Sequence, residues 1–332
     1  MRIVLITVVL LGVYRSLSAG FSLSIGRSLV VSGLSQGSMY ALLALGFSMI
    51  YSTLRFINLA HGDFLMVGSM IGWVVAGPLV FGGWWFQAPA LSLLVVLITC
   101  VVTSASVALA SYRWFFRPIR TAPRMTLMVM SLGASFVIQY STRGLLGTRF
   151  KHFPHMVELQ GFWRIAGFRV FRKDVLIVVV ALLLFAALYW LVTRTRTGLA
   201  IRAVADDPEA AAMMGIDVDR TSALVFALGG AAAGVGAFVW LILFPWVTFT
   251  IGIHPGFKAL TAAVVGGIGS WPGAVIGGYL IGVAESVGPS LVLRGLGIPA
   301  AWQLKDVLVF GVLIVALTVR PQGLLGSRDD AV

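Results

Sequence analysis

Residues able to perform covalent or metal chemistry are few in this sequence, and they lie far apart. The only cysteine, Cys100, sits in an apolar run, which excludes a disulfide framework and a multi-cysteine metal site. The four histidines, His61, His152, His155 and His254, form neither an HxxxH nor an HExxH pattern, and no GxxxxGKS or GxxxxGKT stretch provides a P-loop for ATP. The sequence therefore predicts no catalytic residue, no metal site and no cofactor bound by this chain, and an enzyme is a poor fit.

Three polar side chains, Asn58, His61 and Asp63, come together in "NLAHGD" at the start of an apolar run. Polar groups at membrane depth are costly and often mark a pathway or a gate. Alternatively, Asn58 is the N-cap of a helix, Asp63 lies in or near its first turn, and His61 forms a hydrogen bond at the membrane interface. Both readings remain open at this point.

The glycine-rich stretch "GGIGSWPGAVIGG" predicts a broken helix, because Pro272 follows several glycines. Broken helices at mid-membrane present free backbone groups to a substrate, which makes Gly267, Gly269 and Pro272 candidate pathway or gate residues. Small residues four apart also allow close helix packing in lipid. The glycines in that pattern are Gly269, Gly273, Gly277, Gly278 and Gly282. A re-entrant turn at the break would change the number of crossings and the side of the C-terminus.

Two further polar groups lie near the ends of apolar runs. Gln139 and Arg143 are one helical turn apart and can contact a substrate carboxylate, although such an arginine more often extends to the membrane interface. Glu285 closes the glycine-rich run and is expected to pair with Arg294 or with an arginine of a neighbouring loop.

The stretch "DDPEAAAMMGID", residues 206–217, is an acidic island in an apolar chain and predicts a short helix. Asp207 is the expected N-cap, Pro208 the first helical residue, and Glu209 complements the positive helix N-terminus. Gly215 can adopt the left-handed conformation that ends a helix. Asp217 or Asp219 can then cap the next apolar run.

This short helix would expose Met213 and Met214, and methionines suit adaptable contact surfaces. A helix of this length is too short to be stable alone in water. The surrounding loop, 194–220, carries five of the twelve acidic residues of the chain. It is either an ordinary solvated connector or a docking surface for another protein.

The elements that position these residues are membrane helices, as the composition indicates. The chain has 332 residues, of which 59% are hydrophobic and 11% are charged, against about 25% charged in a soluble domain. Its net charge of +12 does not indicate nucleic-acid binding, because the basic residues lie in short loops between apolar runs. The first residues, from Ile3 to Val13, resemble either a signal peptide or an additional membrane segment.

The apolar runs are long enough for about eight transmembrane helices, since one crossing needs about 20 residues. The run Phe64–Tyr112 is too long for one crossing and is expected to divide between Gly77 and Pro89. The other runs are Leu29–Tyr51, Met125–Thr142, Val175–Thr193, Thr221–Ile253, Ala259–Ala284 and Val307–Val319, the last extended back over Lys305 and Asp306. The predicted fold class is therefore an all-α polytopic membrane protein.

Successive loops of a membrane protein lie on alternating sides of the membrane. Loops 52–63, 113–124 and 194–220 are therefore expected on one side, and loops 77–89, 143–174 and 245–258 on the other. The first set carries nine basic residues and the second eight, so the positive-inside rule barely decides the orientation. The dense arginines of 113–124 favour the first set as cytoplasmic. The longer loop 143–174 can form a small lid on the other side.

Four stretches in order resemble one family of transport proteins. "EAAAMMG" (Glu209–Gly215) resembles the EAA…G signature of the permeases of ATP-binding-cassette (ABC) importers. The stretches beginning "GLSQGSMYALLALGF" (Gly33–Gly68) and "GFKALTAAVVGGIG" (Gly256–Ser286), and the ending "RPQGLLG" (Arg320–Gly326), resemble branched-chain amino acid permeases of the LivH type. Asp63 stands where that family commonly has glutamate. The resemblance covers about residues 28–326.

The resemblance implies a domain organisation and partners. Residues 28–326 would form the permease domain, with 194–220 as a cytoplasmic coupling loop, 1–27 as an N-terminal apolar segment and 327–332 as a tail. The chain would assemble with a second related permease subunit, two cytoplasmic ABC ATPase subunits that bind ATP and Mg²⁺, and a periplasmic or surface substrate-binding protein, in the bacterial inner membrane. Contact with an ATPase is expected from Asp207, Pro208, Glu209, Ala210, Ala211, Met213, Met214 and Gly215.

Three alternatives remain open. A urea or short-amide permease shares these motifs. An ion-coupled secondary transporter requires paired acids inside the membrane, and apart from Asp63 and Glu285, both at the ends of runs, the predicted spans carry none. A scaffold or receptor subunit would leave the short acidic helix unexplained.

Overall fold

Helices form most of the chain in the computed structural model, which describes residues 11–16, 18, 23–165, 168–299 and 301–326. Eight of the described helices are long and apolar enough to cross a membrane. The prediction of an all-α polytopic membrane protein with about eight such helices is confirmed. Most of the expected N-terminal segment 1–27, and all of the tail 327–332, lie outside the described residues.

The helical elements follow in chain order. They are α2 (Leu23–Leu54), α3 (His61–Phe81), α4 (Trp84–Gln87), α5 (Pro89–Ser111) with a π-helical continuation (Tyr112–Phe116) and a 3-10 turn (Arg117–Ile119), α6 (Arg124–Leu146), a 3-10 turn (Val157–Leu159), α7 (Arg172–Arg194), α8 (Arg196–Asp206), α9 (Pro208–Met213), α10 (Val218–Leu243), α11 (Ile253–Gly266), α12 (Trp271–Gly288) with a π-helical continuation (Pro289–Leu293), a 3-10 turn (Ala301–Leu304) and α13 (Lys305–Val319).

Four short strands complete the described chain. Strands β2 (Phe162–Ile165) and β3 (Phe168–Phe171) form an antiparallel hairpin. Strand β1 (Lys151–His152) pairs with β4 (Trp246–Val247), which joins two segments almost a hundred residues apart.

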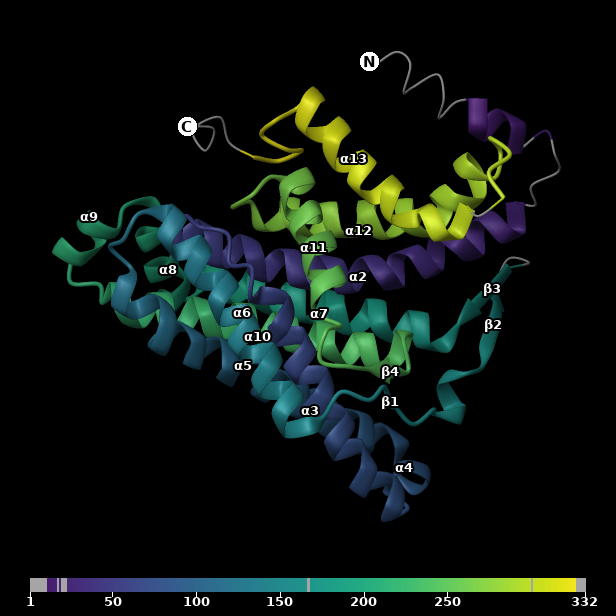
Figure 1. Cartoon of the computed structure of the whole chain (residues 1–332), viewed down its shortest axis with the longest axis horizontal. Coiled ribbons are helices and arrows are strands. Elements are labelled where there is room, and N and C mark those ends of the chain that lie inside the picture. The colour runs from purple at the N-terminus through teal and green to yellow at the C-terminus, as the bar shows by residue number, and fades with distance from the viewer. Residues whose placement is uncertain (1–10, 17, 19–22, 166–167, 300, 327–332) are drawn as a thin grey trace.

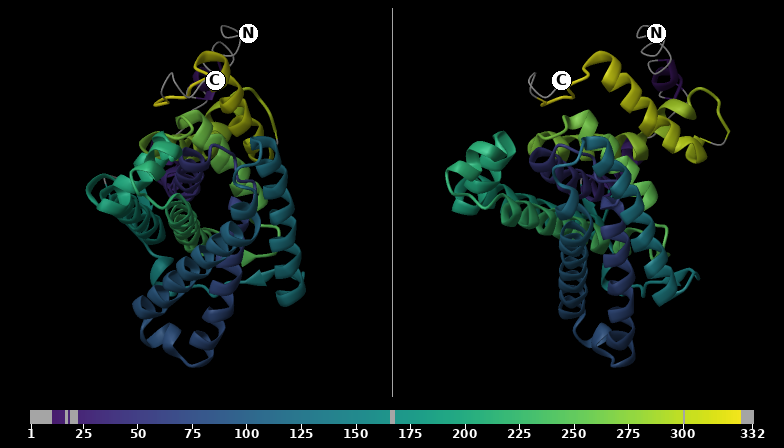
Figure 2. Two further views of the ribbon diagram at one scale, coloured as in Figure 1. Left: turned by 90° about the vertical axis from the view of Figure 1, so that its left-hand side faces the viewer. Right: turned by 60° about the vertical axis from the view of Figure 1, so that its left-hand side comes forward.

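The long helices are arranged around α2, which lies between α12 on one side and α7 and α10 on the other (Figure 1). Helix α9 lies at one end of the molecule and the β2–β3 hairpin at the opposite end. Helices α3 and α5 extend as a pair away from the rest, with α4 at their tip (Figure 2).

The contacts between loops define two ends of the molecule, called here the α9 end and the hairpin end. At the α9 end, the guanidinium of Arg55 donates to the carbonyl of Ala205 at 3.1 Å, and Arg117 pairs with Asp219 at 3.0 Å. At the hairpin end, the indole of Trp85 donates to the carbonyl of His155 at 3.3 Å. Loops 52–63, 113–124 and 194–220 thus lie at the α9 end, and the other set lies at the hairpin end. This is the grouping that the sequence predicts.

The glycines of α12 allow two neighbours to approach its backbone. A Cβ at Gly278 would collide with the backbone of Ala41 in α2, and one at Gly282 with the backbone of Gly37. Gly277 faces the other way, against the carbonyl of Ala262 in α11. Without a hydrophobic driving force between helices in lipid, such close backbone approach is a main source of association.

The run 259–284 is not one span, because the chain reverses within it. Helices α11 and α12 pack side by side across the turn 267–270, and Gly266 contacts Gly273 near the turn. The predicted break is therefore a reversal of the chain between two helices, at the α9 end and not inside the membrane. It brings the end of the described chain back to the α9 end, where the N–H of Leu325 donates to the carbonyl of Gly266 at 2.9 Å.

Two predicted boundaries need correction. Helix α3 continues through Gly77 and Pro78 to Phe81, so its division from α5 occupies residues 82–88, inside the predicted interval but shorter than it. Proline is tolerated inside a membrane helix when neighbouring groups satisfy the backbone. The run that begins at Thr221 is helical only to Leu243, and a non-helical segment with β4 follows it.

The glycine contacts predict a difference between two matched substitutions. Gly278→Ala should destabilise the protein by about 1–3 kcal/mol, because the added methyl group meets the backbone of α2. Gly311→Ala in α13 should be neutral or slightly stabilising, because nothing lies within 4 Å of a Cβ there. Thermal unfolding of the two purified variants in detergent compares them, and equal unfolding midpoints would contradict the assigned α2–α12 contact.

Candidate functional site

Helix α9 has both of its ends fixed by hydrogen bonds. Asp207 is its N-cap, and its Oδ1 accepts the backbone N–H of Glu209 at 2.9 Å. At the other end Gly215 has a φ of +85°, and the N–H of Ile216 donates to the carbonyl of Ala211 at 3.0 Å. These bonds satisfy backbone N–H and C=O groups that have no partner within the helix at its termini. A six-residue helix is therefore specified locally by its caps.

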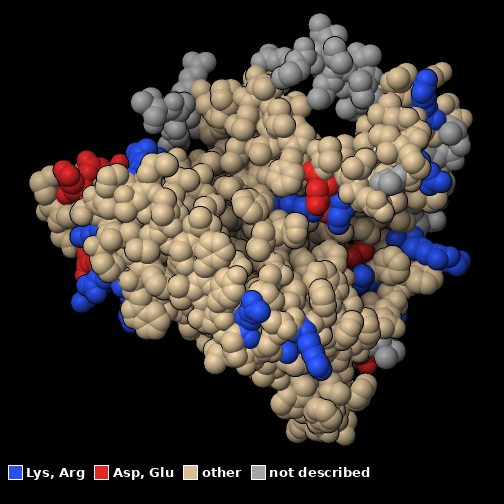
Figure 3. Space-filling model, in the orientation of Figure 1, with Lys and Arg blue, Asp and Glu red and all other residues tan. Residues whose placement is uncertain are grey.

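The surface of α9 combines exposed apolar and acidic side chains. Met213 and Met214 are 82% and 83% exposed, and Glu209 is exposed beside them. The space-filling view shows acidic side chains gathered at this end of the molecule (Figure 3). Of the residues predicted to contact an ATPase, Ala211 is buried and faces the body of the protein. The outward surface of α9 is made by the methionines and the acidic side chains.

Helix α8 connects α9 to the spans α7 and α2. Thr195 caps α8 by accepting the N–H of Gly198 at 3.1 Å, and the guanidinium of Arg202 donates to the carbonyl of Val192 in α7. Arg55, which follows α2, holds the carbonyl of Ala205 near the end of α8. Helix α9 is thus joined to two spans through a second, packed helix.

Asp219, in the first turn of α10, binds the helix that extends α5. Its carboxylate pairs with Arg117 at 3.0 Å and accepts the hydroxyl of Tyr112 at 2.9 Å. Arg117 is 60% exposed, so the pair contributes little to stability and mainly fixes geometry. Asp217 is the N-cap of α10 and accepts the N–H of Arg220 at 3.0 Å. The segment around α9 therefore contacts α2, α5, α7 and α10.

The first candidate pathway residue, Asn58, is not a helix N-cap. Helix α3 begins at His61, and Ala60 occupies the cap position without a side-chain hydrogen bond. The Asn58 carboxamide oxygen instead accepts the N–H of Ala60 at 3.1 Å and closes a turn ahead of the helix. Its Nδ2 is buried and has no hydrogen-bond partner in the described part of the chain.

His61 is fully buried, so the expected hydrogen bond at the membrane interface is wrong. Its ring packs against Phe47 at 4.6 Å and Phe64 at 5.5 Å, centroid to centroid, and occupies the space that a side chain at Gly46 would need. Neither ring nitrogen makes a hydrogen bond within the described residues, although the Leu43 carbonyl lies close to the ring. His61 fills space between α2 and α3 and bears no catalytic geometry.

Asp63 is the centre of a buried polar cluster with two residues of α6. Its Oδ2 accepts the hydroxyl of Ser135 at 2.5 Å, and its Oδ1 accepts the Gln139 amide at 2.9 Å. The same amide donates to Ser135 at 3.0 Å. The sequence singled out Asp63 and Gln139 separately and missed Ser135. Arg143 lies elsewhere: it is exposed and stacks against Phe249 at 5.5 Å.

This cluster lies deep in the membrane-spanning part of the molecule. Ser135 stands at the middle of α6, and the N–H of Leu59 donates to Ser131 one turn earlier on that helix. The non-helical segment 55–60 therefore runs inward from the α9 end, and α3 begins inside the bundle. Non-helical backbone at such depth is tolerated only where it is buried in protein or lines a cavity.

A second helix also begins inside the bundle, against the first turn of α3. A Cβ at Gly62 would collide with the backbone of Gly252, which precedes α11, and would meet Gly256 in its first turn. Helix α11 has 14 residues, about 21 Å, which is shorter than the bilayer core of about 30 Å. The N-termini of α3 and α11 thus meet through glycines.

The other candidate gate residues, Gly267, Gly269 and Pro272, lie away from the Asp63 cluster. Gly267 and Gly269 have φ angles of +108° and +90° and form the turn between α11 and α12. Gly269 and Pro272 line a cavity of about 630 Å³ at the α9 end, together with Arg55 and Arg202. The expectation that the break lies at mid-membrane is wrong. Gly269, being in the turn, is also not part of the packing face of α12.

A buried ion-pair network joins α11, α12 and α13, and the sequence missed it. Glu285 pairs with Lys258 at 2.7 Å and with Lys305 at 3.1 Å, and it accepts the hydroxyl of Tyr40 at 2.7 Å. Lys258 also pairs with Asp306 at 2.7 Å. The predicted partner, Arg294, is therefore wrong, because the reversal at 267–270 brings Lys258 next to Glu285. Two lysines balance two carboxylates in this network.

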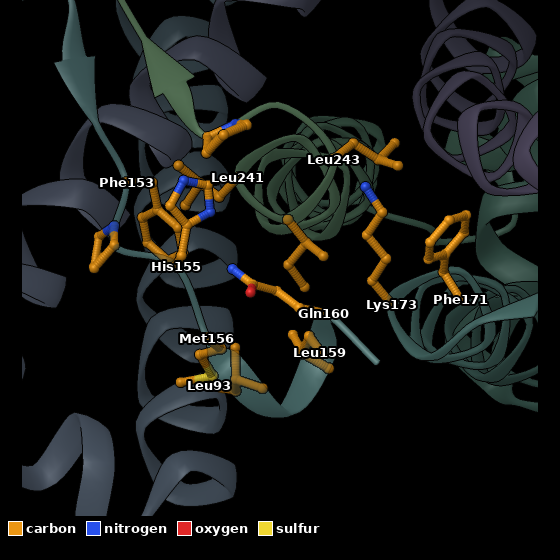
Figure 4. A pocket seen from close by; sticks show the side chains of 13 residues that line it. Leu93, Phe153, His155, Met156, Leu159, Gln160, Phe171, Lys173, Leu241 and Leu243 are labelled. Atoms are coloured by element: carbon orange, nitrogen blue, oxygen red, sulfur yellow. The ribbon is translucent and has the colours of Figure 1, made fainter. Parts of the chain in front are cut away.

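A cavity of about 310 Å³ opens at the hairpin end, between the end of α10 and the segment 153–160 (Figure 4). Apolar side chains form most of its wall. The polar groups His155, Gln160 and Lys173 lie along its sides. Such a lining suits a small molecule with both apolar and charged parts. In the described part of the chain, no group of three or more His, Cys, Asp or Glu side chains is placed to hold a metal.

The fold and these sites define a polytopic membrane protein with a short, capped and exposed helix at one end and a polar cluster at mid-depth. The family model described as "Branched-chain amino acid transport system / permease component" matches residues 29–317. The chain belongs to this family of permease components. The sequence-based identification of the family is therefore confirmed.

Curated relatives agree over nearly the whole chain. The high-affinity branched-chain amino acid transport system permease protein BraD of Pseudomonas aeruginosa is 33% identical over 303 residues, which are 90% of this chain and 95% of BraD. The LivH protein of Escherichia coli K12, with the same description, is 32% identical over 90% of this chain and 94% of its own length. The fructose import permease protein FrcC of Rhizobium meliloti is 33% identical over 42% of this chain and 38% of FrcC.

The ion-pair network predicts a strong effect of removing one charge. Lys258→Met should destabilise the protein, but by less than the about 3–5 kcal/mol of a fully uncompensated buried charge, because the buried Glu285 would keep its charge with only Lys305 beside it. The double variant Lys258→Met, Glu285→Met should recover most of that loss, since it removes one charge of each sign. Unfolding of the purified variants in mixed micelles measures both effects. A double variant as unstable as the single one would contradict the network.

Proposed function

We propose that this chain is the membrane-spanning subunit of an ABC importer in the bacterial inner membrane, and that α9 is the surface that contacts an ATPase subunit. The observation that carries the proposal is a short helix, capped at both ends, that exposes Met213 and Met214 at one end of the molecule. Large exposed apolar side chains at such a place favour a protein partner. Membership of the permease family supports the same role.

The assembly would contain four kinds of subunit. This chain and a second, related permease subunit would form the transport pathway, and two cytoplasmic ABC ATPases would bind and hydrolyse ATP with Mg²⁺. A periplasmic or surface binding protein would deliver the substrate. This chain would then be a transport subunit without catalytic activity of its own, since its sequence has no P-loop.

The mechanism we propose is alternating access driven by the ATPases. Closure of the ATPase pair on ATP would displace α9 together with α8. The spans that contact this segment, α7 and α10 directly and α2 through Arg55, would tilt with it. Contacts of the α8–α9 segment with α2, α7 and α10 support movement of a group of helices rather than of one loop.

The cargo we propose is a branched-chain amino acid or a closely related amino acid. The relatives that cover about 90% of this chain are described as branched-chain amino acid permeases. Matches over 42% of the chain include permeases described for fructose and for autoinducer 2, so shared segments alone do not determine the cargo. A urea or short-amide permease is the alternative that a transport assay would distinguish.

The neighbouring acids Glu285 and Asp306 do not favour an ion-coupled secondary transporter. Glu285 and Asp306 lie near each other, as such a transporter would require, but Lys258 and Lys305 already balance their charges. A carboxylate that binds a coupling ion must exchange its cation during transport. Glu285 and Asp306 instead form a fixed network with two lysines between three helices. The network is better explained as an anchor between α11, α12 and α13.

The docking role predicts loss of coupling in two variants of α9. Glu209→Lys reverses a charge at the start of the helix, and Gly215→Leu strains the left-handed residue that ends it. In the complete transporter, reconstituted in proteoliposomes, each should reduce substrate uptake and substrate-stimulated ATP hydrolysis at least about tenfold, the factor that 1.4 kcal/mol of lost association produces.

The matched control is Glu158→Lys, which makes the same charge change at an exposed position of the hairpin end. It should leave association with the ATPases unchanged. Normal uptake and normal stimulated hydrolysis in both α9 variants would refute the docking role.

A further inference from the structure

We propose that Asp63 binds the ammonium group of the transported amino acid, in a pocket between α3, α6 and α11. The proposal rests on the proposed function, because it assumes that an amino acid crosses the membrane along this chain. To the proposed function it adds the residue that binds the ligand, the polar side chains that orient this residue, and the chemical class of the ligand.

The pocket is small, mostly apolar and carries one ionisable side chain. Its volume is about 160 Å³, below the roughly 300 Å³ at which pockets for drug-sized ligands begin. Asp63, Ser135 and Gln139 supply its polar side chains. The remaining wall consists of glycines and apolar side chains, among them Phe47, Leu132, Phe136 and Phe257. Such a lining suits a compact ligand with a positive group and an aliphatic part.

The Asp63 carboxylate has polar partners but no positive one. Ser135 and Gln139 each donate one hydrogen bond to it, and both are neutral. No basic side chain of the described residues pairs with it or acts on its charge. An ionised carboxylate has about four acceptor positions, so two donors leave room for an ammonium group. A buried charge without an opposite charge is costly, and a cationic ligand removes that cost.

Ser135 and Gln139 act as positioning residues for this carboxylate. Both lie on α6, one turn apart, and Gln139 also donates to Ser135, so the three side chains form a closed set of hydrogen bonds. This set holds both Asp63 oxygens in fixed directions. Fixed groups lose less entropy when a ligand binds, which favours a defined orientation of the ammonium group.

The place of the pocket in the fold is one where transporters bind their cargo. It lies at the middle of α6, and the first turns of α3 and α11, two helices that begin inside the bundle, form part of its wall. Non-helical backbone and helix ends at mid-depth are features of transport sites in other membrane proteins. The charge-balanced network at Glu285 lacks this combination of a cavity and an unbalanced charge.

The apolar wall of the pocket reaches the outside of this chain. Leu132, Phe136 and Phe257 are 46%, 52% and 51% exposed. In a pathway formed by two permease subunits, this face would be turned toward the other subunit. An aliphatic side chain would then lie against these residues while its ammonium group reaches Asp63.

The experiment places a cysteine reporter in the pocket of the complete transporter. Leu132→Cys introduces a thiol beside Asp63, and the native Cys100 is fully buried, so it should not react with a thiol reagent. The probes are L-leucine and 4-methylpentanoate, which has the same carbon skeleton without the ammonium group. Leucine should slow labelling about tenfold at ten times its dissociation constant, by simple occupancy. 4-Methylpentanoate should leave the labelling rate unchanged.

Variants of Asp63 in the same background test the residue itself. Asp63→Asn keeps the shape and removes the charge, so protection by leucine should require at least about tenfold more leucine. Asp63→Glu should retain protection. The matched control is Asp174→Asn at the start of α7, another acid that is 2% exposed and lies outside this pocket. It should leave protection unchanged.

Each result has a defined meaning. Protection by leucine alone, lost in Asp63→Asn and retained in the other two variants, supports the proposal. Equal protection by both probes, unchanged protection in Asp63→Asn, or no protection by leucine overturns it. A wild-type transporter that does not take up branched-chain amino acids would instead refute the proposed cargo. Uptake by wild type together with unaltered protection in Asp63→Asn refutes only the role of Asp63.

Discussion

The contact between the first turns of α3 and α11 is the constraint on which the rest of this structure depends. Gly62 and Gly252 meet so closely that neither position accepts a side chain. Two helices can therefore begin inside the bundle, and the non-helical segments that lead to them must be enclosed by protein. Phe56, Asn58 and Ala60 are accordingly buried. The same contact places Asp63, one residue after Gly62, against the middle of α6.

Helix α9 and the Asp63 cluster are joined by a short stretch of chain. Arg55 holds the carbonyl of Ala205 at the end of α8, directly before α9, and the segment 55–60 leads from Arg55 to the first turn of α3. Leu59 in this segment also binds Ser131 of α6. A displacement of α9 thus has a direct physical route to both helices that hold the Asp63 carboxylate. This connection suggests how ATP-driven movement at one end would alter a site at mid-depth.

Local features of the fold could be predicted from the sequence, and contacts between distant segments could not. The caps of α9 at Asp207 and Gly215 and the break before Pro272 follow from residues that are neighbours in the chain. Lys258 pairs with Glu285 because the chain reverses at 267–270. The glycines of that turn do not by themselves predict the direction of the reversal. The sequence did not identify Ser135 as a site residue, because a serine in an apolar helix usually forms a hydrogen bond with the backbone of its own helix. For Asp63, a position at membrane depth was one of the two readings that the sequence left open, and the other, a helix that begins at the membrane surface, is wrong because α3 begins inside the bundle.

The central claim, that α9 meets a soluble ATPase, is tested most directly by the accessibility of one position. Met213→Cys places a thiol on the exposed face of α9, and Glu158→Cys places one at the opposite end of the molecule. Both are labelled in open membrane fragments with a soluble thiol reagent, before and after addition of the purified ATPase subunits. If α9 contacts an ATPase, the ATPases should slow labelling of the cysteine at 213 and leave labelling of the cysteine at 158 unchanged. Equal labelling of the cysteine at 213 with and without bound ATPases would contradict it.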